Sequence, residues 1–209
     1  MPVTPIVADT AQEQSVRNLV DQALDVLGGV DILVNSAAEV GSRVAFPLPE
    51  ANVDVFRDEL NVKVLGTLRC IQHVAPHMIR RGWGRIINIS GMNARNTGSI
   101  IGSSRNVVLV AMTKNIADEL GPHGINVTVV HPGLTLTERY LAQAESTATA
   151  RGVSVDEVIS ERFGGNVLRR PMTATDVAHV VAFLASPKSV AINGDAIAVA
   201  GGYPGAIHY

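Results

Sequence analysis

Few side chains in this sequence stand at spacings that could support chemistry. His73 and His77 are four residues apart, so on a helix both imidazoles would share one face and could hold a metal ion. No third ligand follows at a recognisable spacing, so we interpret both histidines as surface or interface residues and predict no metal site. The single cysteine, Cys70, lies in an apolar helical context. We therefore expect a buried hydrophobic side chain rather than a reactive thiol.

Three candidate residues directly follow an apolar run. Asn35, Ser36 and Ala37 come after the nearly continuous apolar stretch of residues 30–34, which is typical of a parallel strand covered on both faces. Ligands of α/β proteins bind at the carboxyl ends of such strands. These three residues are therefore candidate ligand contacts. Tyr140 could face the same cleft, but no lysine is close to it in sequence, so we favour a packing or lid role.

The segments that must position these residues alternate between strands and helices. The hydrophobic pattern predicts strands at about 3–8, 30–36, 84–90, 124–131 and 195–200. It predicts helices at about 11–27, 52–81, 101–120 and 173–184, and a helical insertion at about 134–170. Alternation in this order indicates parallel βαβ units with right-handed crossovers. We therefore expect a doubly wound, Rossmann-like α/β sheet in one domain spanning residues 1–209.

Composition excludes several classes of partner. The 209 residues are 46% hydrophobic, with 17 basic and 19 acidic side chains, a net charge of −2 and no long run of one sign. Nucleic acid and membranes are therefore not expected partners. The first residues have neither the basic nor the apolar segment of a signal peptide, so a cytoplasmic location is expected.

Five segments in series resemble the short-chain dehydrogenase/reductase family, and the match covers essentially the whole chain. Residues 31–38 resemble the family's D-x-L-V-N-N-A-G strand end, and residues 84–90 its G-R-I-V-N-I-S strand. Residues 120–133 resemble E-L-G-P-x-G-I-R-V-N followed by P-G, and residues 192–202 the closing I-T-G and D-G-G. Asn61 stands where the family's helix carries its N-V-x-G asparagine.

The resemblance implies NAD or NADP as cofactor and assigns residues to it. Pro132, Gly133 and Thr137 match the family's P-G-x-x-x-T, which contacts the nicotinamide carboxamide. Asn35, Ser36 and Ala37 lie at the carboxyl end of a strand, where the family binds its cofactor. Asp9 resembles an acid that contacts the adenine edge, but it precedes a helix, and we favour a role in capping that helix.

The sequence also departs from the family. The opening glycine-rich turn, T-G-x-x-x-G-x-G, has no counterpart, and the chain begins near the family's third strand, so the first two strands and one helix are not represented. We expect weak or absent dinucleotide binding by this chain, because that turn places the pyrophosphate at a helix N-terminus. We also expect strand 3–8 to move in beside strand 30–36, covering its edge.

The catalytic positions are altered as well. We align the family's Y-x-x-x-K with Ile101 and Arg105, and its catalytic serine with Gly91, next to Ser90. Asn61, Ser90 and Arg105 are then the remnants of the catalytic set. Ile101 has no proton to give, and Arg105 is a poor proton shuttle because a guanidinium stays protonated in proteins.

Three functions stay open at this point. The first is a family protein with lost or impaired hydride transfer, acting as an oligomer subunit or ligand-binding protein. The second is an active NAD(P)-dependent oxidoreductase on a small ketone or secondary alcohol, whose missing N-terminus a longer native chain supplies. The third is a sensor for a small-molecule ligand in the same cleft. The resemblance further implies a homo-oligomer through helices 52–81 and 101–120, with a tetramer through the C-terminal strand as an extension.

Overall fold

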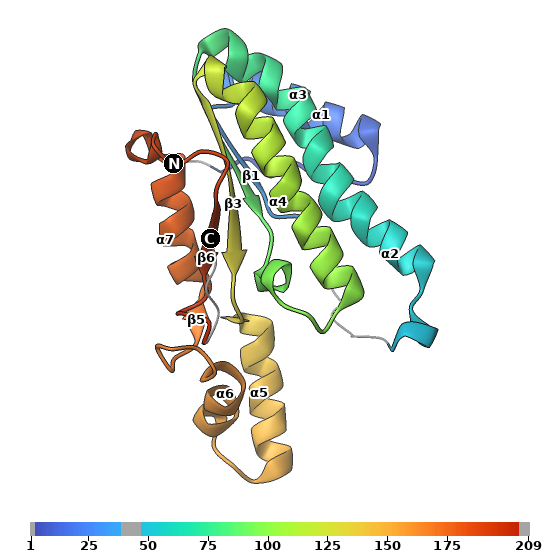
Figure 1. The fold of residues 1–209 in the computed structure, drawn as a ribbon, viewed down its shortest axis with the longest axis vertical. Coiled ribbons are helices and arrows are strands. Elements are labelled where there is room, and N and C mark those ends of the chain that lie inside the picture. Colours follow the sequence, from blue (N-terminus) through green and yellow to red (C-terminus); the bar gives the residue numbers. More distant parts are fainter. Residues whose placement is uncertain (1–2, 39–46, 205–209) are drawn as a thin grey trace.

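A parallel four-stranded sheet forms the centre of the protein. The computed structural model describes residues 3–38 and 47–204, and its sheet contains β1 (Ile32–Asn35), β2 (Gly84–Ile89), β3 (Ile125–Pro132) and β6 (Ala196–Val199) in the order β1-β2-β3-β6. All three strand pairs are parallel. The predicted Rossmann-like α/β fold is confirmed (Figure 1).

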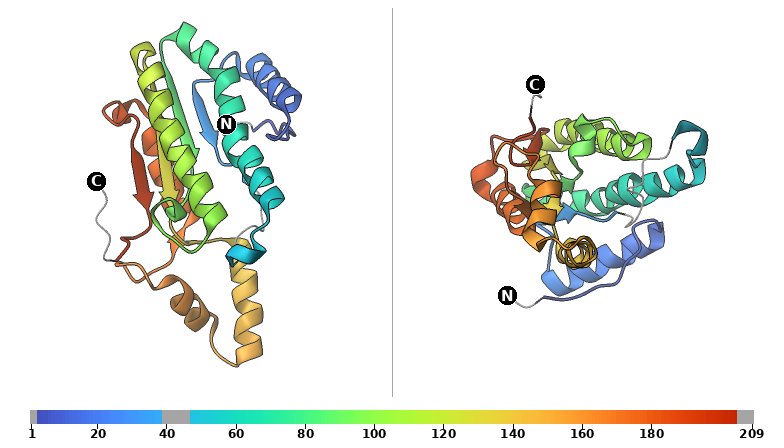
Figure 2. Two further views of the ribbon diagram at one scale, coloured as in Figure 1. Left: turned by 45° about the vertical axis from the view of Figure 1, so that its right-hand side comes forward. Right: turned by 90° about the horizontal axis from the view of Figure 1, so that it is seen from below.

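Helices cover the two faces of this sheet, and neighbouring strand residues point to opposite layers. Three helices, α1 (Glu13–Leu27), α3 (Gly66–Arg81) and α4 (Ile100–Leu120), lie together, and α7 (Ala174–Ala185) lies on the other side (Figures 1 and 2). Ile86 of β2 belongs to the core beneath α1, α3 and α4, whereas Ile87 packs toward Leu184 of α7. This alternation explains why both strand faces are apolar.

The long helix predicted at 52–81 is present with an interruption. It runs through α2 (Val53–Glu59), a π-helical turn η2 (Leu60–Leu65) and α3, and it begins at Asn52, whose side chain accepts hydrogen bonds from the backbone of residues 54 and 55. Single π-helical turns inside α-helices are frequent at functional sites. Cys70 lies within α3, where burial raises the pKa of its thiol.

The chain leaves the sheet after β3 and returns at α7. Between them lie β4 (Thr135–Leu136), α5 (Glu138–Arg151), α6 (Val155–Phe163) and β5 (Met172–Thr173), and β4 pairs with β5. Helices α5 and α6 extend beyond the carboxyl ends of the strands (Figure 1) and share a small core built on Ala144, Ala148 and Val158. Short 3-10 turns connect other elements: η1 (Leu48–Glu50), η3 (Met92–Arg95), η4 (Gly121–His123) and η5 (Pro187–Ser189).

The predicted strand at 3–8 is wrong. Residues 3–8 form no strand, and Val3 and Val7 are exposed. Pro5 cannot donate a backbone hydrogen bond, which disfavours a place within a sheet. Just after this segment, the Thr10 hydroxyl donates a hydrogen bond to the carbonyl oxygen of Val62 in η2 at 3.3 Å. The segment therefore runs past η2 instead of beside β1.

β1 consequently forms an open edge of the sheet within the described residues, and the predicted repair of that edge does not occur. Ile32 and Val34 of β1 are 45% and 43% exposed, which is unusual for an inner strand of this fold. Among the residues that the structure describes, no helix is both long and apolar enough to cross a membrane.

Candidate functional site

A chain of amide and hydroxyl groups crosses the sheet near the carboxyl ends of β1 and β2. The side chain of Asn35 donates to Asn88 at 2.9 Å, and Asn88 donates to the hydroxyl of Thr113 on α4 at 3.0 Å. Asn35 therefore ties β1 to β2, while Ser36 and Ala37 are exposed just beyond the strand end. Of these three predicted cofactor contacts, only Ser36 and Ala37 present their side chains to solvent.

Asn106 is the α4 side chain nearest to the predicted serine position. A Cβ atom placed on Gly91 would lie 3.2 Å from Asn106 Nδ2, and the Ser90 hydroxyl donates to the Asn106 carbonyl oxygen at 3.3 Å. Asn106 is 4% exposed, and its Oδ1 is buried without a hydrogen-bond partner. The sequence analysis did not single out Asn106, because it aligned the family's lysine with the preceding residue, Arg105.

Arg105 points toward a neighbouring helix. Its guanidinium forms an ion pair with Glu59 at the end of α2, and these side chains are 12% and 2% exposed. Ile101, one turn earlier, is buried. If the family's Y-x-x-x-K is aligned one residue later, its two positions fall on Gly102 and Asn106, which share the adjacent face of α4. A Cβ on Gly102 would meet the side chains of Asn93 and Ser99 at 2.7 and 2.9 Å.

The π-helical turn contributes two polar residues that point in different directions. Asn61, the predicted remnant, accepts a hydrogen bond from Arg69 at 2.9 Å. Arg69 in turn lies near Glu13 of α1, so the contacts of Asn61 are on the α1 side. Lys63 is the residue that reaches the site: its Nζ donates to the Ser90 carbonyl oxygen at 3.0 Å, and it is 5% exposed. The extra residue of a π-turn shifts the helical faces on either side of it, a change that hydrophobic periodicity does not reveal.

The predicted nicotinamide-side residues lie where β3 ends. Pro132 is the last residue of β3, and the Gly133 backbone N–H donates to the Val199 carbonyl oxygen of β6 at 2.9 Å. A Cβ on Gly133 would approach the Ala200 Cβ to 2.8 Å, so glycine is required for this close contact. Thr137 begins α5 without a side-chain capping bond and is exposed.

Asp9 builds the turn before α1. Its carboxylate accepts from the Ala11 backbone N–H at 2.9 Å, and its own backbone N–H donates to the Ser15 hydroxyl at 2.9 Å. These bonds belong to a capping turn. The exposed carboxylate lies just before α1.

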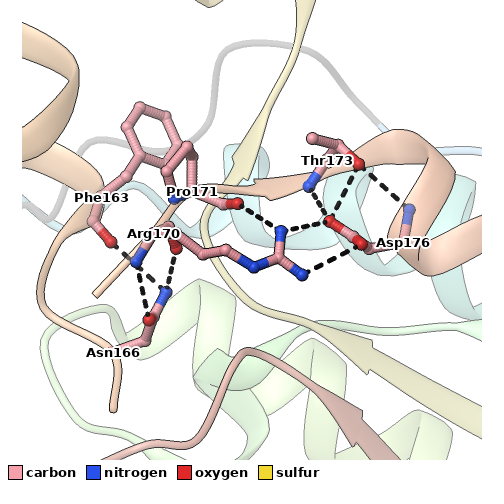
Figure 3. A network of polar contacts seen from close by, with 6 residues as sticks. All are labelled: Phe163, Asn166, Arg170, Pro171, Thr173 and Asp176. Carbon is pink, nitrogen blue, oxygen red and sulfur yellow. Dashed lines mark hydrogen bonds and ion pairs between the residues drawn. The ribbon is translucent and has the colours of Figure 1, made fainter. Parts of the chain in front are cut away.

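A polar network fixes the segment that returns from α6 to α7 (Figure 3). The Arg170 guanidinium binds both carboxylate oxygens of Asp176 at 3.2 and 3.3 Å, and Asp176 closes a capping box with Thr173 at the start of α7. Asn166 donates to the Arg170 carbonyl oxygen at 2.6 Å. The hydrogen bond from Arg170, followed by those from Thr173, holds the pKa of Asp176 below its usual range.

The same segment is tied to the end of the chain. The backbone N–H groups of Val167 and Leu168 donate to the carbonyl oxygens of Gly202 and Gly201 at 3.0 Å each. Within α5 and α6, Tyr140 packs edge-on against Phe163 with the ring centroids 4.7 Å apart. Tyr140 therefore belongs to the core of this helical pair.

The two histidines have other partners. His73 lies 2.7 Å from a Glu13 carboxylate oxygen, and His77 lies 2.6 Å from an Arg80 guanidinium nitrogen. Across residues 3–38 and 47–204, no three histidine, cysteine, aspartate or glutamate side chains gather in a group that could hold a metal ion.

Comparisons with known proteins agree with this architecture. A family model described as enoyl-(acyl carrier protein) reductase matches residues 1–204. The short-chain reductase protein NovJ of Streptomyces niveus is 34% identical over 197 residues, which cover 94% of this chain and 72% of NovJ. The 3-oxoacyl-(acyl-carrier-protein) reductase FabG of Staphylococcus epidermidis is 30% identical over 199 residues, 94% of this chain and 76% of FabG.

A solved structure gives the same result in three dimensions. ElxO with NADP bound superimposes with a TM-score of 0.81 at 26% identity, covering 93% of this chain and 75% of ElxO. The order of strands, the strand-end motifs and these likenesses agree along nearly the whole sequence. The chain belongs to the short-chain dehydrogenase/reductase family.

Proposed function

We propose that hydride transfer between NAD(P) and a carbonyl or alcohol is lost or impaired in this chain, and that the protein acts as an oligomer subunit or a ligand-binding protein. One observation carries the proposal: the α4 residue beside Gly91 is Asn106, and neither Ile101 nor Gly102 one turn earlier has an ionisable hydroxyl. The absence of the tyrosine therefore holds whichever of the two alignments of α4 is used.

Carbonyl reduction by hydride requires a proton donor at the oxygen. General acid–base catalysis typically contributes about 10²–10⁴-fold to a rate. The amide of Asn106 does not titrate near neutral pH, and the Arg105 guanidinium is paired with Glu59. Tyr140 is packed against Phe163. A normal turnover rate is therefore not expected, because none of these residues is placed to donate the proton.

The charges near the site also disfavour a dinucleotide. Lys63 donates to the Ser90 carbonyl oxygen, and Arg105 pairs with Glu59, so both cations are engaged within the protein. The described residues thus do not fit a pyrophosphate, and we derive no step through NAD(P). Neutral hydrogen bonds contribute only about 1 kcal/mol each, which does not offset the cost of ordering a flexible dinucleotide.

The direct test is calorimetric titration of the 209-residue chain with NAD, NADH, NADP and NADPH, together with an assay of ketone reduction. We expect dissociation constants no tighter than about 1 mM and no appreciable turnover. A low-micromolar dissociation constant with any of the four nucleotides would refute the proposal.

A second candidate, an active oxidoreductase on a small ketone or secondary alcohol, is favoured by a different observation. The outer edge of β1 is open in the described residues, and Ile32 and Val34 expose apolar surface there. The chain also spans 72% and 76% of the two relatives given above. A preceding segment of a longer native chain could cover this surface and supply the glycine-rich turn.

The genomic sequence upstream of the first codon separates these candidates. An in-frame segment encoding T-G-x-x-x-G-x-G supports the active enzyme, and the longer protein should then bind a dinucleotide in the micromolar range. A stop codon directly upstream supports the first proposal.

A further inference from the structure

The turn before β6 contains the dipeptide Asn193-Gly194, which the proposed function does not use. It is the one place in the 209-residue sequence where glycine follows asparagine. The family's closing I-T-G, which residues 192–194 resemble, has threonine at the position of Asn193, so the resemblance assigns no modification to it. Asparagine followed by glycine is the pair most open to spontaneous deamidation, because glycine has no Cβ to obstruct attack by its own backbone nitrogen.

Deamidation at this dipeptide needs no reactant except water. The Gly194 backbone nitrogen loses its proton to solvent and attacks the side-chain carbonyl carbon, Cγ, of Asn193. The bond from Cγ to Nδ2 then breaks, the leaving group takes up a proton and departs as ammonia, and a succinimide ring remains. Water opens that ring at either carbonyl carbon, which gives aspartate or isoaspartate. Both reacting groups must therefore be free to approach each other.

In the folded chain both reacting groups are held by one residue of β3. The Val127 backbone N–H donates to Oδ1 of Asn193 at 2.8 Å, and the Gly194 backbone N–H donates to the Val127 carbonyl oxygen at 2.8 Å. Val127 is 0% exposed and belongs to the main core. The attacking nitrogen thus keeps its proton in a backbone hydrogen bond while the amide is fixed by another, and both bonds must break before the ring can close.

Two further contacts restrain the same turn. The Asn126 side chain donates to the carbonyl oxygens of Val190 and Ile192 at 2.9 Å each, so the segment leading to Asn193 is tied to β3. Nδ2 of Asn193 donates to the Ala117 carbonyl oxygen in the last turn of α4 at 3.4 Å. The asparagine side chain therefore joins β3, α4 and the start of β6.

We infer that Asn193-Gly194 is a deamidation site that the fold keeps closed and that opening of the junction between β3 and β6 releases. The product does not fit the same junction. Isoaspartate lengthens the backbone two residues before Asp195, whose carbonyl oxygen accepts from the Val129 N–H at 3.0 Å where the pairing of β3 with β6 begins. The longer backbone displaces β6 along β3, and the negative charge of either product faces the carbonyl end of α4. A chain modified while open is thus hindered from closing again.

The test compares deamidation in the folded full chain and in the chain unfolded with guanidinium chloride, both at mildly alkaline pH. Circular dichroism verifies the two states, and mass spectrometry of proteolytic peptides measures aspartate and isoaspartate at each asparagine. In denaturant, Asn193 should deamidate faster than any other asparagine. In the folded chain its rate should be at least about tenfold lower, because only the open fraction reacts. Equal rates in the two states, or another asparagine reacting fastest in denaturant, overturn the inference.

A variant loosens the restraint without changing the dipeptide. Asn126→Ala removes the two bonds to the segment before Asn193, so the folded variant should deamidate there at least about fivefold faster than the parent, with an unchanged rate in denaturant. The matched control is Asn115→Ala at an exposed position of α4, whose side chain donates to Ala111 within the same helix and which should react as the parent does. The parent's rate in folded Asn126→Ala overturns the inference.

A second variant tests the chemistry independently of the fold. Measured in denaturant, the added methyl group of Gly194→Ala should slow deamidation of Asn193 at least about fivefold. An unchanged rate overturns the inference even if Asn126→Ala does not fold.

The hindrance to closing is measured on chains deamidated in denaturant and then diluted into buffer. Size-exclusion chromatography should find isoaspartate at residue 193 depleted from the refolded fraction relative to the starting mixture, and equal content in both would contradict the inference. None of these outcomes depends on dinucleotide binding, so the inference is independent of the proposed function.

Discussion

Glu59 and Arg105 form an ion pair between α2 and α4, and their side chains are only 2% and 12% exposed. Charges withdrawn from water are tolerated when each has its partner, but an unpaired one is costly. We therefore expect Arg105→Met to lower the free energy of unfolding by about 3–5 kcal/mol. Urea denaturation followed by circular dichroism measures this change.

The double variant Glu59→Leu/Arg105→Leu tests whether the unpaired charge causes this loss of stability. Removing both charges leaves neither unpaired, so its stability should lie close to that of the parent or above it. Arg57→Met serves as the control, because Arg57 pairs with Asp54 at the surface and its loss should cost less than about 1 kcal/mol. A double variant as unstable as Arg105→Met would contradict this account of the pair.

The alignment of α4 can be tested with an introduced tyrosine. In Gly102→Tyr/Asn106→Lys, a new lysine beside Gly91 should lower the pKa of the new tyrosine below its ordinary value of about 10. In Ile101→Tyr/Arg105→Lys, the lysine faces Glu59 instead, so no such lowering is expected. Ultraviolet titration of tyrosinate absorbance, with the parent chain subtracted, measures both.

That titration needs a reference variant. Gly102→Tyr requires the exposed Asn93 side chain and the Ser99 side chain, which caps α4, to move, since a Cβ at Gly102 lies 2.7 Å from Asn93 Nδ2 and 2.9 Å from Ser99 Oγ. The single variant Gly102→Tyr therefore provides the reference for folding and for the tyrosine pKa without lysine. A lowered tyrosine pKa in the Ile101 variant and none in the Gly102 variant would support the alignment of Ile101 and Arg105 with the family's tyrosine and lysine.

The sequence was sufficient to predict the sheet and the helices around it, because buried parallel strands and amphipathic helices carry strong patterns. Within β2, for example, Ile86 packs into the layer of α1, α3 and α4, whereas Ile87 and Ile89 pack toward α7. It was insufficient for the segment 3–8, where apolar residues suggested a strand but Pro5 and the contacts of Thr10 decided otherwise.

The candidate site was harder to predict for a geometric reason. A shift of one residue turns a side chain by about 100° around a helix, so Arg105 and Asn106 face different neighbours. With the tyrosine missing, no residue fixed the alignment of α4. Only the distance between Asn106 and Gly91 distinguishes the two faces. Lys63 was missed for a related reason, because the π-helical turn that carries it leaves no trace in the pattern of apolar residues.

Self-association through the α4 surface is the third expectation. Val107 and Val108 are 49% and 42% exposed in the single chain, in a helix that the family resemblance assigns to subunit contact. Light scattering at micromolar concentration should return at least twice the 22.0 kDa chain mass. Val107→Glu/Val108→Glu should return the monomer mass, whereas Val190→Glu, at a more exposed position (67%) outside the helices that the resemblance assigns to subunit contact, should not. A 22.0 kDa parent species would contradict the dimer.

The contact between Arg170 and Asp176 should make stability depend on pH in a defined direction. The hydrogen bond from Arg170, with those from Thr173, lowers the pKa of Asp176 in the folded chain. Because the unfolded chain has an ordinary pKa of about 4, the ionised carboxylate stabilises the fold above that pH. This stabilisation decreases as the pH falls toward the depressed value. Arg170→Met should therefore lower the thermal midpoint at pH 7, and the difference from the parent should narrow below pH 4.

The effect should be small, because the two side chains are 52% and 28% exposed and solvent screens their attraction. Arg162→Met is the matched control, since it removes the same charge from an exposed position on α6 without touching Asp176. Midpoints from differential scanning calorimetry between about pH 2.5 and 7 separate the two variants. If Arg162→Met followed the same pH profile as Arg170→Met, net charge and not the contact with Asp176 would be responsible. If the difference in thermal midpoint between the parent and Arg170→Met widened at acid pH, Arg170 would not be the group that lowers the pKa of Asp176.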